Sequence, residues 1–113
     1  MNWAEAETAG NTRMQLFVAF NYGGRAEILD AAAKFEGGGE EDFRRLLYAP
    51  EMSDPDVLIR TSGEVRTSNF LLWQCAYSEL VFRPELWPDF TREAFEESLE
   101  EFAARRRRFG ARA

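Results

Sequence analysis

The sequence predicts an α/β fold in which a parallel sheet is flanked by helices. Two short apolar runs, LFVAF (16–20) and DVLIR (56–60), have the continuous hydrophobicity of strands that are covered on both faces. Segments with helical periodicity separate and follow these runs, an alternation that is typical of parallel sheets with helical connections. In such folds ligands bind where strands end and helices begin.

The first third of the chain is expected to contain a loop, a strand and a helix. Residues 1–13 are small and polar after Trp3, which indicates a frayed helical turn or a loop. The run 16–20 is the first predicted strand, and the following NYGG ends it. Apolar residues then recur on one helical stripe over 25–35, and three consecutive glycines (37–39) stop this helix.

The middle of the chain predicts a second α/β unit. EEDFRRLLYA (40–49) is expected to form a shorter helix, because acids occupy its first turn and arginines follow them. DVLIR (56–60) is the second predicted strand, and RTSGEVRT is the loop after it. SNFLLWQCAYSEL (68–80) predicts a largely buried helix with Ser68 as its N-cap.

The last third predicts a short strand and a long helix. LVF (80–82) is the strand, and RPELWPDF (83–90), with its two prolines, is an irregular turn. TREAFEESLEEFAARRRRF (91–109) has an apolar face, acids at its start and arginines at its end, as a stable amphipathic helix requires. No repeat or interdomain linker divides residues 1–113, which are expected to form a single domain or part of one.

Composition and charge exclude several classes of function. The net charge of −6 and the pI near 4.7 argue against a nucleic-acid-binding surface, since phosphate backbones require a basic stripe. The absence of His excludes His-based triads and His metal sites. The single cysteine, Cys75, lies in an apolar run and is expected to be a buried free thiol, which suits the reducing cytoplasm.

The segment RTSGEVRTS (60–68) is the strongest candidate for a binding site. Arg60 and Arg66 offer guanidinium forks, hydroxyl residues including Ser68 add donors, and Gly63 would let backbone amides approach a ligand. A helix that starts at Ser68 would add free N–H groups, so the segment could bind phosphate or diphosphate. Equally, the arginines could pair with Glu64, and composition does not decide between these two interpretations.

Three other features have competing interpretations. Glu79 is expected at the end of the apolar helix, where it could bind Mg²⁺ or form an ordinary salt bridge. The arginines at 105–108 match a solvated helix end that complements the helix dipole. NYGGR (21–25) fits a tight turn and matches neither the P-loop nor the dinucleotide fingerprint.

Several long motifs resemble the cis-prenyltransferase family, whose best-known bacterial member is undecaprenyl diphosphate synthase. They are NYGGRAEI (21–28), DVLIRTSGEVRTSNFLLWQCAYSEL (56–80) and LWPDF (86–90), and they occur in the family's order. The match extends from about Thr8 to Gly110. The resemblance implies a parallel sheet flanked by helices, and an enzyme that acts as a homodimer.

The resemblance also implies an activity. The family condenses isopentenyl diphosphate with an allylic diphosphate such as farnesyl diphosphate, uses Mg²⁺, forms a Z double bond at each addition and releases diphosphate. Its polyprenyl product is a lipid, which is compatible with peripheral contact with a membrane. The aspartate-rich DDxxD motif of the unrelated trans-prenyltransferases is absent.

Matched by position, individual residues take the family's roles. Arg60, Arg66 and Ser68 resemble the residues that bind the diphosphate of isopentenyl diphosphate. Glu79 is similar to the acidic residue that helps to hold Mg²⁺. Arg108 and Gly110 resemble the C-terminal RxG motif, which reaches the active site of the partner subunit. Asn21 and Arg25, in a further shared motif, are expected to be structural, and Val65 replaces a His of some bacterial members.

The family's DGNGRWA-type loop, with its essential aspartate, has no counterpart in this sequence. No catalytic residue is therefore assigned, and residues 1–113 are expected to correspond to the C-terminal half of a cis-prenyltransferase. Such a chain should be weak or inactive alone and should need an N-terminal half or a full-length homologue as its partner. The alternative is a non-catalytic accessory subunit that docks on a full-length prenyltransferase.

Overall fold

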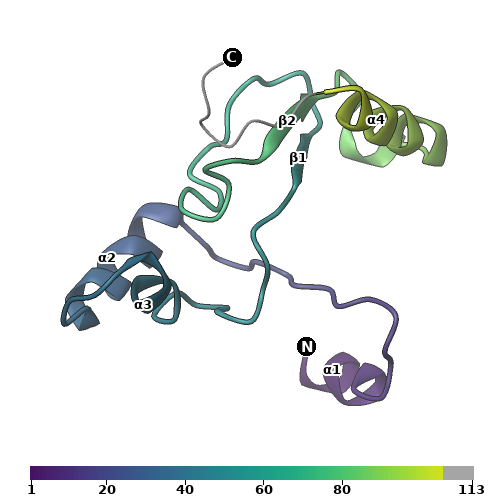
Figure 1. Ribbon diagram of the computed structural model, residues 1–113. Coiled ribbons are helices and arrows are strands. Elements are labelled where there is room, and N and C mark those ends of the chain that lie inside the picture. The colour runs from purple at the N-terminus through teal and green to yellow at the C-terminus, as the bar shows by residue number, and fades with distance from the viewer. Residues whose placement is uncertain (106–113) are drawn as a thin grey trace.

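The computed structural model describes residues 1–105 of the 113-residue chain and contains four α-helices, one 3₁₀-helix and two strands in that range (Figure 1). In chain order these elements are α1 (Asn2–Thr8), α2 (Gly24–Lys34), α3 (Glu40–Arg44), β1 (Val57–Arg60), β2 (Glu79–Phe82), η1 (Trp87–Asp89) and α4 (Arg92–Ala104). Arg108 and Gly110, which were predicted to act in trans, lie outside the described residues.

The sheet is parallel, as the sequence predicts. β1 pairs with β2 from Val57 opposite Glu79 to Arg60 opposite Phe82. Both strands therefore end at the same edge, where Arg60 and the segment after Phe82 lie together. The strands predicted at 56–60 and 80–82 are confirmed within one residue at each start.

The strand predicted at 16–20 does not form. This segment is extended, and Leu16, Val18 and Phe20 are exposed to solvent. The sheet found among residues 1–105 consists of β1 and β2 alone, and 16–20 pairs with neither. Because no neighbouring strand offers donors and acceptors to its backbone, the segment has strand composition without a hydrogen-bonded ladder.

The helix predicted at 68–80 is also wrong, because this segment is a series of turns. Ser68, Asn69 and Leu71 have φ values of 49°, 66° and 46°, which are left-handed and interrupt an α-helix at its start. Asn69 instead caps α2: its backbone oxygen accepts the Gly24 N–H at 2.7 Å, and its Oδ1 accepts the Arg25 N–H at 2.9 Å. Ser68 is therefore not an N-cap.

The remaining helices agree more closely with prediction. α2 is confirmed, and α3 ends at Arg44, earlier than the expected residue 49. The Thr91 hydroxyl caps α4 by accepting the Ala94 N–H at 3.2 Å. α1 forms a regular helix where a frayed turn or loop was expected, and none of its residues is buried.

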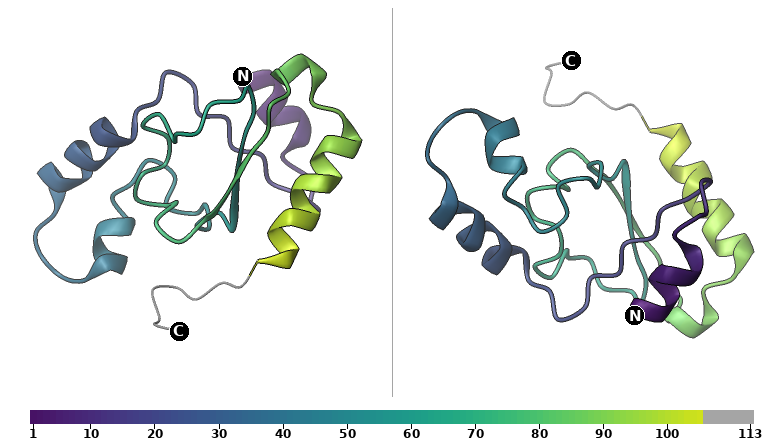
Figure 2. Two further views of the ribbon diagram at one scale, coloured as in Figure 1. Left: turned by 90° about the horizontal axis from the view of Figure 1, so that it is seen from above. Right: turned by 90° about the horizontal axis from the view of Figure 1, so that it is seen from below.

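Figures 1 and 2 show α2 and α3 gathered on one side of the molecule and α4 on the other, with the two strands between them. α4 packs on β2, where Ala94, Ser98 and Val81 are buried. The buried apolar core in the described part is small, consisting of Ala31, Leu47, Val81 and Ala94. Within residues 1–105, every helix is too short or too polar to cross a membrane.

Candidate anion-binding site

The segment 60–68 begins at the carboxyl edge of the sheet. Arg60 is the last residue of β1, and its carbonyl accepts the Arg83 N–H at 2.8 Å, one residue beyond β2. In parallel sheets this edge is where ligands collect, because the loops that follow the strands converge there. We call residues 60–68 the arginine loop.

Two consecutive residues give the arginine loop its turn. Ser62 and Gly63 have φ values of 74° and 71°, and the left-handed conformation costs roughly 1–2 kcal/mol for a residue with a side chain. Their N–H groups donate to the Glu85 carbonyl at 2.7 Å and the Arg83 carbonyl at 2.9 Å. The expectation that amides near Gly63 would face a ligand is therefore not met, because both donate within the protein.

The two arginines of the loop converge on one carboxylate. Glu64 Oε2 forms a salt bridge with Arg60 Nη2 and lies 3.4 Å from Arg66 Nε. Arg60 Nη1 also donates to the Arg66 carbonyl at 3.1 Å. The hydrogen bond from Arg66 and the positive charges of both arginines lower the pKa of Glu64 below its ordinary value. The pairing of the arginines with Glu64, which the sequence left open, is thus present in the structure.

This pairing leaves the arginines accessible. The Arg66 side chain is 66% exposed and that of Arg60 is 25% exposed. Ion pairs at the surface contribute little net free energy, so Glu64 is held only weakly in place. The guanidinium groups of both arginines are thus accessible, and guanidinium forks suit carboxylate and phosphate oxygens alike.

Ser68 lies further along the same loop and differs from its prediction. It is exposed and left-handed, and no helix starts there to supply a dipole. In the part of the chain that the structure describes, no hydrogen bond joins Ser68 to Arg60 or Arg66. Of the three loop residues predicted to bind the ligand, the structure therefore brings Arg60 and Arg66 together but not Ser68.

Glu79 occupies the first position of β2 and not the end of a helix. Its Oε2 lies 3.3 Å from Arg105 Nη1, so the salt-bridge interpretation describes its contacts. Arg105 also donates to the Leu80 carbonyl at 2.6 Å and to Glu101 at 2.5 Å. Among residues 1–105, no group of three or more His, Cys, Asp or Glu side chains could hold a metal ion. These residues alone do not fit a Mg²⁺ site.

A buried carboxylate that sequence reasoning did not identify organises the other side of the molecule. Glu27 is 2% exposed and accepts hydrogen bonds from Tyr22 Oη at 2.5 Å, Gln74 Nε2 at 3.0 Å and the Tyr48 N–H at 3.0 Å. Its position four residues before the buried Ala31, on the same face of α2, was the available signal. It borders an open, mainly apolar cleft of about 360 Å³.

Cys75 is partly buried, and burial raises the pKa of its thiol. A thiol with a raised pKa is a poor nucleophile at neutral pH. The predicted free thiol is therefore present, but it is only partly buried, where full burial was expected.

Comparison with known proteins identifies relatives across almost the whole chain. The family described as "Putative undecaprenyl diphosphate synthase" matches residues 1–110. An isoprenyl transferase of Thermotoga maritima is 54% identical over 96% of the chain. Isoprenyl transferase 2 of Bradyrhizobium diazoefficiens is 52% identical over 97%. The chain spans 51% and 48% of these two proteins, about half of their length.

Solved structures agree with the sequence comparisons. A probable undecaprenyl diphosphate synthase from Campylobacter jejuni superposes with a TM-score of 0.85 at 34% identity. Lavandulyl diphosphate synthase from Lavandula x intermedia, solved in complex with dimethylallyl diphosphate, superposes with a TM-score of 0.90 at 34% identity. Each match covers 97% of this chain and 54% or 52% of the other chain.

Proposed function

Because the chain belongs to the undecaprenyl diphosphate synthase family of cis-prenyltransferases, we propose that its arginine loop binds the diphosphate of isopentenyl diphosphate during prenyl transfer. The observation that carries this proposal is the convergence of Arg60 and Arg66 on one carboxylate at the carboxyl edge of the sheet. A site that already holds an anionic group between two guanidinium forks has the chemistry that a diphosphate requires.

The residues of this chain would act by binding and orientation. Arg66 is the more exposed of the two arginines, so it would capture the diphosphate first, and Arg60 would then exchange Glu64 for a phosphate oxygen. Ser68 would add a hydroxyl donor if the loop closes over the ligand. The bound diphosphate would hold the double bond of isopentenyl diphosphate in a fixed position for attack on the allylic carbon.

The other parts of the reaction are proposed to come from elsewhere. The chain spans about half the length of its relatives, and we assign the allylic diphosphate site, for example for farnesyl diphosphate, to the part of their length that residues 1–113 do not span. The family uses Mg²⁺ to assist the departure of the allylic diphosphate. Glu79 could contribute one carboxylate to that ion only if Arg105 releases it. The role that we propose for residues 1–113 is therefore diphosphate binding.

Two further residues complete the proposal. Arg108 and Gly110 lie outside the described residues, and their proposed role is to reach the isopentenyl diphosphate site of a partner subunit. A homodimer, or a complex with a full-length homologue, would supply that arrangement. The acidic chain, with net charge −6, is proposed to have no nucleic-acid partner.

Prenyl transfer from labelled isopentenyl diphosphate to farnesyl diphosphate, with Mg²⁺, tests the proposal. The chain would be assayed alone and together with a separately expressed N-terminal half of a relative. We expect product only in the mixture, and loss of that product in Arg66→Ala. Arg45→Ala is the matched control, because Arg45 is an exposed arginine on the other side of the molecule. Equal activity of Arg66→Ala and the parent mixture would contradict the assignment of the loop.

A second candidate function is that of an accessory subunit for a full-length prenyltransferase. The exposed apolar side chains of 14–20 would be covered by an N-terminal half in the first proposal and by the full-length homologue in this one. It predicts that the chain co-purifies with a full-length homologue and stimulates its activity without any N-terminal half. Failure to associate with such a homologue would eliminate it.

A further inference from the structure

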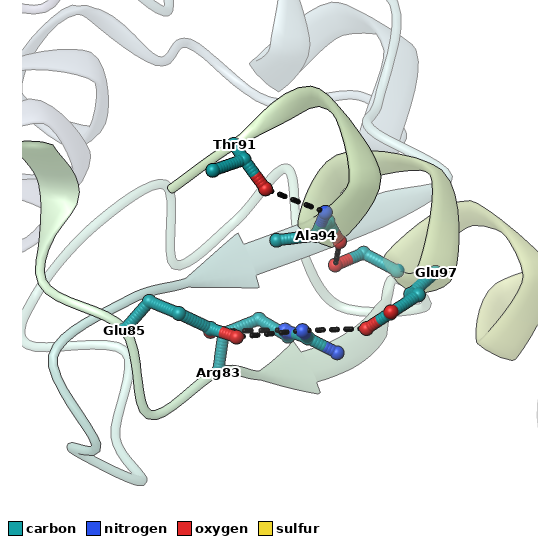
Figure 3. A network of polar contacts seen from close by, with 6 residues as sticks. Arg83, Glu85, Thr91, Ala94 and Glu97 are labelled. Atoms are coloured by element: carbon teal, nitrogen blue, oxygen red, sulfur yellow. Dashed lines mark hydrogen bonds and ion pairs between the residues drawn. The ribbon is translucent and has the colours of Figure 1, made fainter. Parts of the chain in front are cut away.

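Arg83 lies just beyond β2 and is held by two carboxylates. Its Nε and Nη2 donate to Glu85 Oε2 and Oε1 at 3.1 and 2.7 Å, and Nη2 also donates to Glu97 Oε2 at 2.8 Å. Figure 3 shows the guanidinium group between these two acids. The side chain is only 16% exposed, and two carboxylates already balance its charge. Arg83 is thus not available to bind an anion itself.

The same residues hold the arginine loop through their backbones. The Arg83 N–H donates to the Arg60 carbonyl at 2.8 Å, and the Arg83 carbonyl accepts the Gly63 N–H at 2.9 Å. The Glu85 carbonyl accepts the Ser62 N–H at 2.7 Å. The bidentate side-chain pair between Arg83 and Glu85 therefore fixes the two carbonyl groups on which the start of the loop rests.

The start of the loop needs this support. Ser62 and Gly63 are both left-handed, and such a backbone persists only where the surroundings hold it. Their conformation sets the direction in which the chain leaves β1. It consequently sets where Glu64 and Arg66 lie relative to Arg60, and the two arginines must converge to share one ligand.

The third partner, Glu97, connects this arrangement to α4. Figure 3 shows that helix capped by Thr91, which accepts the Ala94 N–H. The helix packs on β2, and its Ala94 and Ser98 are buried. The Glu97 contact with Arg83 therefore ties the start of the loop to the longest helix in the described part of the chain.

From this geometry we propose that Arg83, clamped by Glu85 and Glu97, is a positioning residue that holds Arg60 and Arg66 in the arrangement that binds a diphosphate. The inference rests on the proposed function of the arginine loop and extends it to residues that do not touch the ligand. The clamp keeps the left-handed turn at Ser62 and Gly63 closed before the ligand arrives. Preorganised cationic groups bind an anion more tightly, because the ligand does not have to order them.

Titration of the full chain with inorganic pyrophosphate, alongside urea unfolding, tests this role. We expect Arg83→Ala to weaken pyrophosphate binding by about fivefold or more, because part of the free energy of binding must then be spent on ordering the loop. Arg83→Lys, which keeps the charge but not the bidentate fork, should fall between Arg83→Ala and the parent. Arg92→Ala is the matched control, since it breaks the 2.8 Å Arg92–Glu96 pair on α4 without touching the loop.

Glu97→Gln guards against the failure of Arg83→Ala to fold. It removes one of the two negative charges that pair with Arg83 and leaves the side-chain volume nearly unchanged, so the urea midpoint should stay near that of the parent. We expect weaker pyrophosphate binding together with faster amide hydrogen exchange at Ser62 and Gly63. A purely structural role would lower the urea midpoint without this local change in affinity.

The outcomes separate the inference from the proposed function. If Arg60→Ala and Arg66→Ala abolish pyrophosphate binding but Glu97→Gln and Arg83→Lys bind like the parent, the positioning role is overturned and the loop keeps its function. If the parent itself binds no pyrophosphate, the proposed function fails. The rate of amide exchange at Ser62 and Gly63 then still decides whether the clamp holds the turn. Unchanged exchange in Glu97→Gln would overturn the role of the clamp.

Discussion

At the scale of single residues, Glu27 shows how neutral donors can satisfy a buried carboxylate. Three donors from different segments satisfy it, namely the Tyr22 hydroxyl, the Gln74 amide and the Tyr48 N–H. Hydrogen bonds to a charged acceptor are each worth about 1.5–3 kcal/mol, enough to offset much of the desolvation of one carboxylate. Glu27 thus joins the segments before α2, after α3 and within 61–78.

The Tyr22 hydroxyl, which is a partner of Glu27, leads to a prediction about the pH dependence of stability. Burial, followed by the hydrogen bond to Glu27, raises the pKa of Tyr22 above its ordinary value of 10.0. The stability that the protonated Tyr22 hydroxyl contributes is complete below about pH 10, where unfolded tyrosine is protonated. It is lost as pH rises through the pKa of Tyr22 in the folded state. We therefore expect Tyr22→Phe to flatten the fall in stability between about pH 9 and about pH 11.

Urea midpoints at the two pH values measure this effect. Tyr48→Phe is the matched comparison, because a hydrogen bond to Asp30 also raises the pKa of Tyr48, but its hydroxyl is exposed. We expect it to flatten the profile less than Tyr22→Phe does. Identical pH profiles for Tyr22→Phe and the parent would refute the role assigned to Tyr22.

The chemistry of the loop was more predictable from the sequence than its geometry. Arg60 and Arg66 are recognisable because an apolar strand leads directly into two guanidinium groups, and the structure places them together. The Ser62 and Gly63 amides donate to the Glu85 and Arg83 carbonyl groups, and these hydrogen bonds depend on a contact between segments some twenty positions apart. No local pattern reports such a contact, so neither that contact nor the clamp could be predicted.

At the scale of elements, the junction between α2 and the segment 68–74 explains the paired glycines. A Cβ on Gly24 would lie 2.9 Å from Leu72 Cγ and 3.0 Å from the Asn69 carbonyl oxygen. The carbonyl oxygen that would be displaced also accepts the Gly24 N–H. Gly24 is therefore required by close packing, and the tight turn expected from the sequence is only part of its role.

Gly24→Ala should destabilise the chain for this reason. Helix propensity alone favours alanine by about 1 kcal/mol, but overpacking against a fixed backbone atom costs about 1–3 kcal/mol. We expect the net loss to appear as a lower urea midpoint. Gly10→Ala is the control, because no atom lies within 4 Å of the added Cβ there. A Gly24→Ala chain as stable as Gly10→Ala would mean that 68–74 can move away at little cost.

The two wrong element predictions have related physical causes. The run 16–20 has the composition of a buried strand, but a strand needs a hydrogen-bonding neighbour, and neither β1 nor β2 pairs with it. The segment 68–80 has the composition of a buried helix, but the Asn69 cap on α2 holds its first residues in left-handed conformations. The lack of a pairing strand in the first case and the cap on α2 in the second overrode the local preference of the sequence.

At the scale of the whole molecule, the chain exposes far more surface than a compact protein of its mass. Its accessible surface is 9076 Å², whereas about 6,300 Å² is expected for a monomer of 13.0 kDa. Its radius of gyration of 16.3 Å also exceeds the roughly 13 Å expected for this length. Part of the excess is the exposed apolar segment 14–20.

This excess surface predicts self-association. Exposed Leu16 and Phe20 should pair with other copies in the absence of a partner chain, so the weight-average mass should rise with concentration in sedimentation equilibrium. Replacing both with Lys should suppress the rise. Leu29→Lys, an equally exposed leucine on α2, should not. A parent chain that stays monomeric at every concentration would contradict the prediction.

The salt bridges of Glu64 determine how the arginine loop responds to acidity. Guanidinium groups stay protonated in proteins, and the pKa of Glu64 is held below its already acidic ordinary value. The sequence contains no histidine that could titrate near neutrality. The loop thus carries an unchanging charge through the physiological range, and any pH dependence of anion capture there reflects the ionisation of the anion itself.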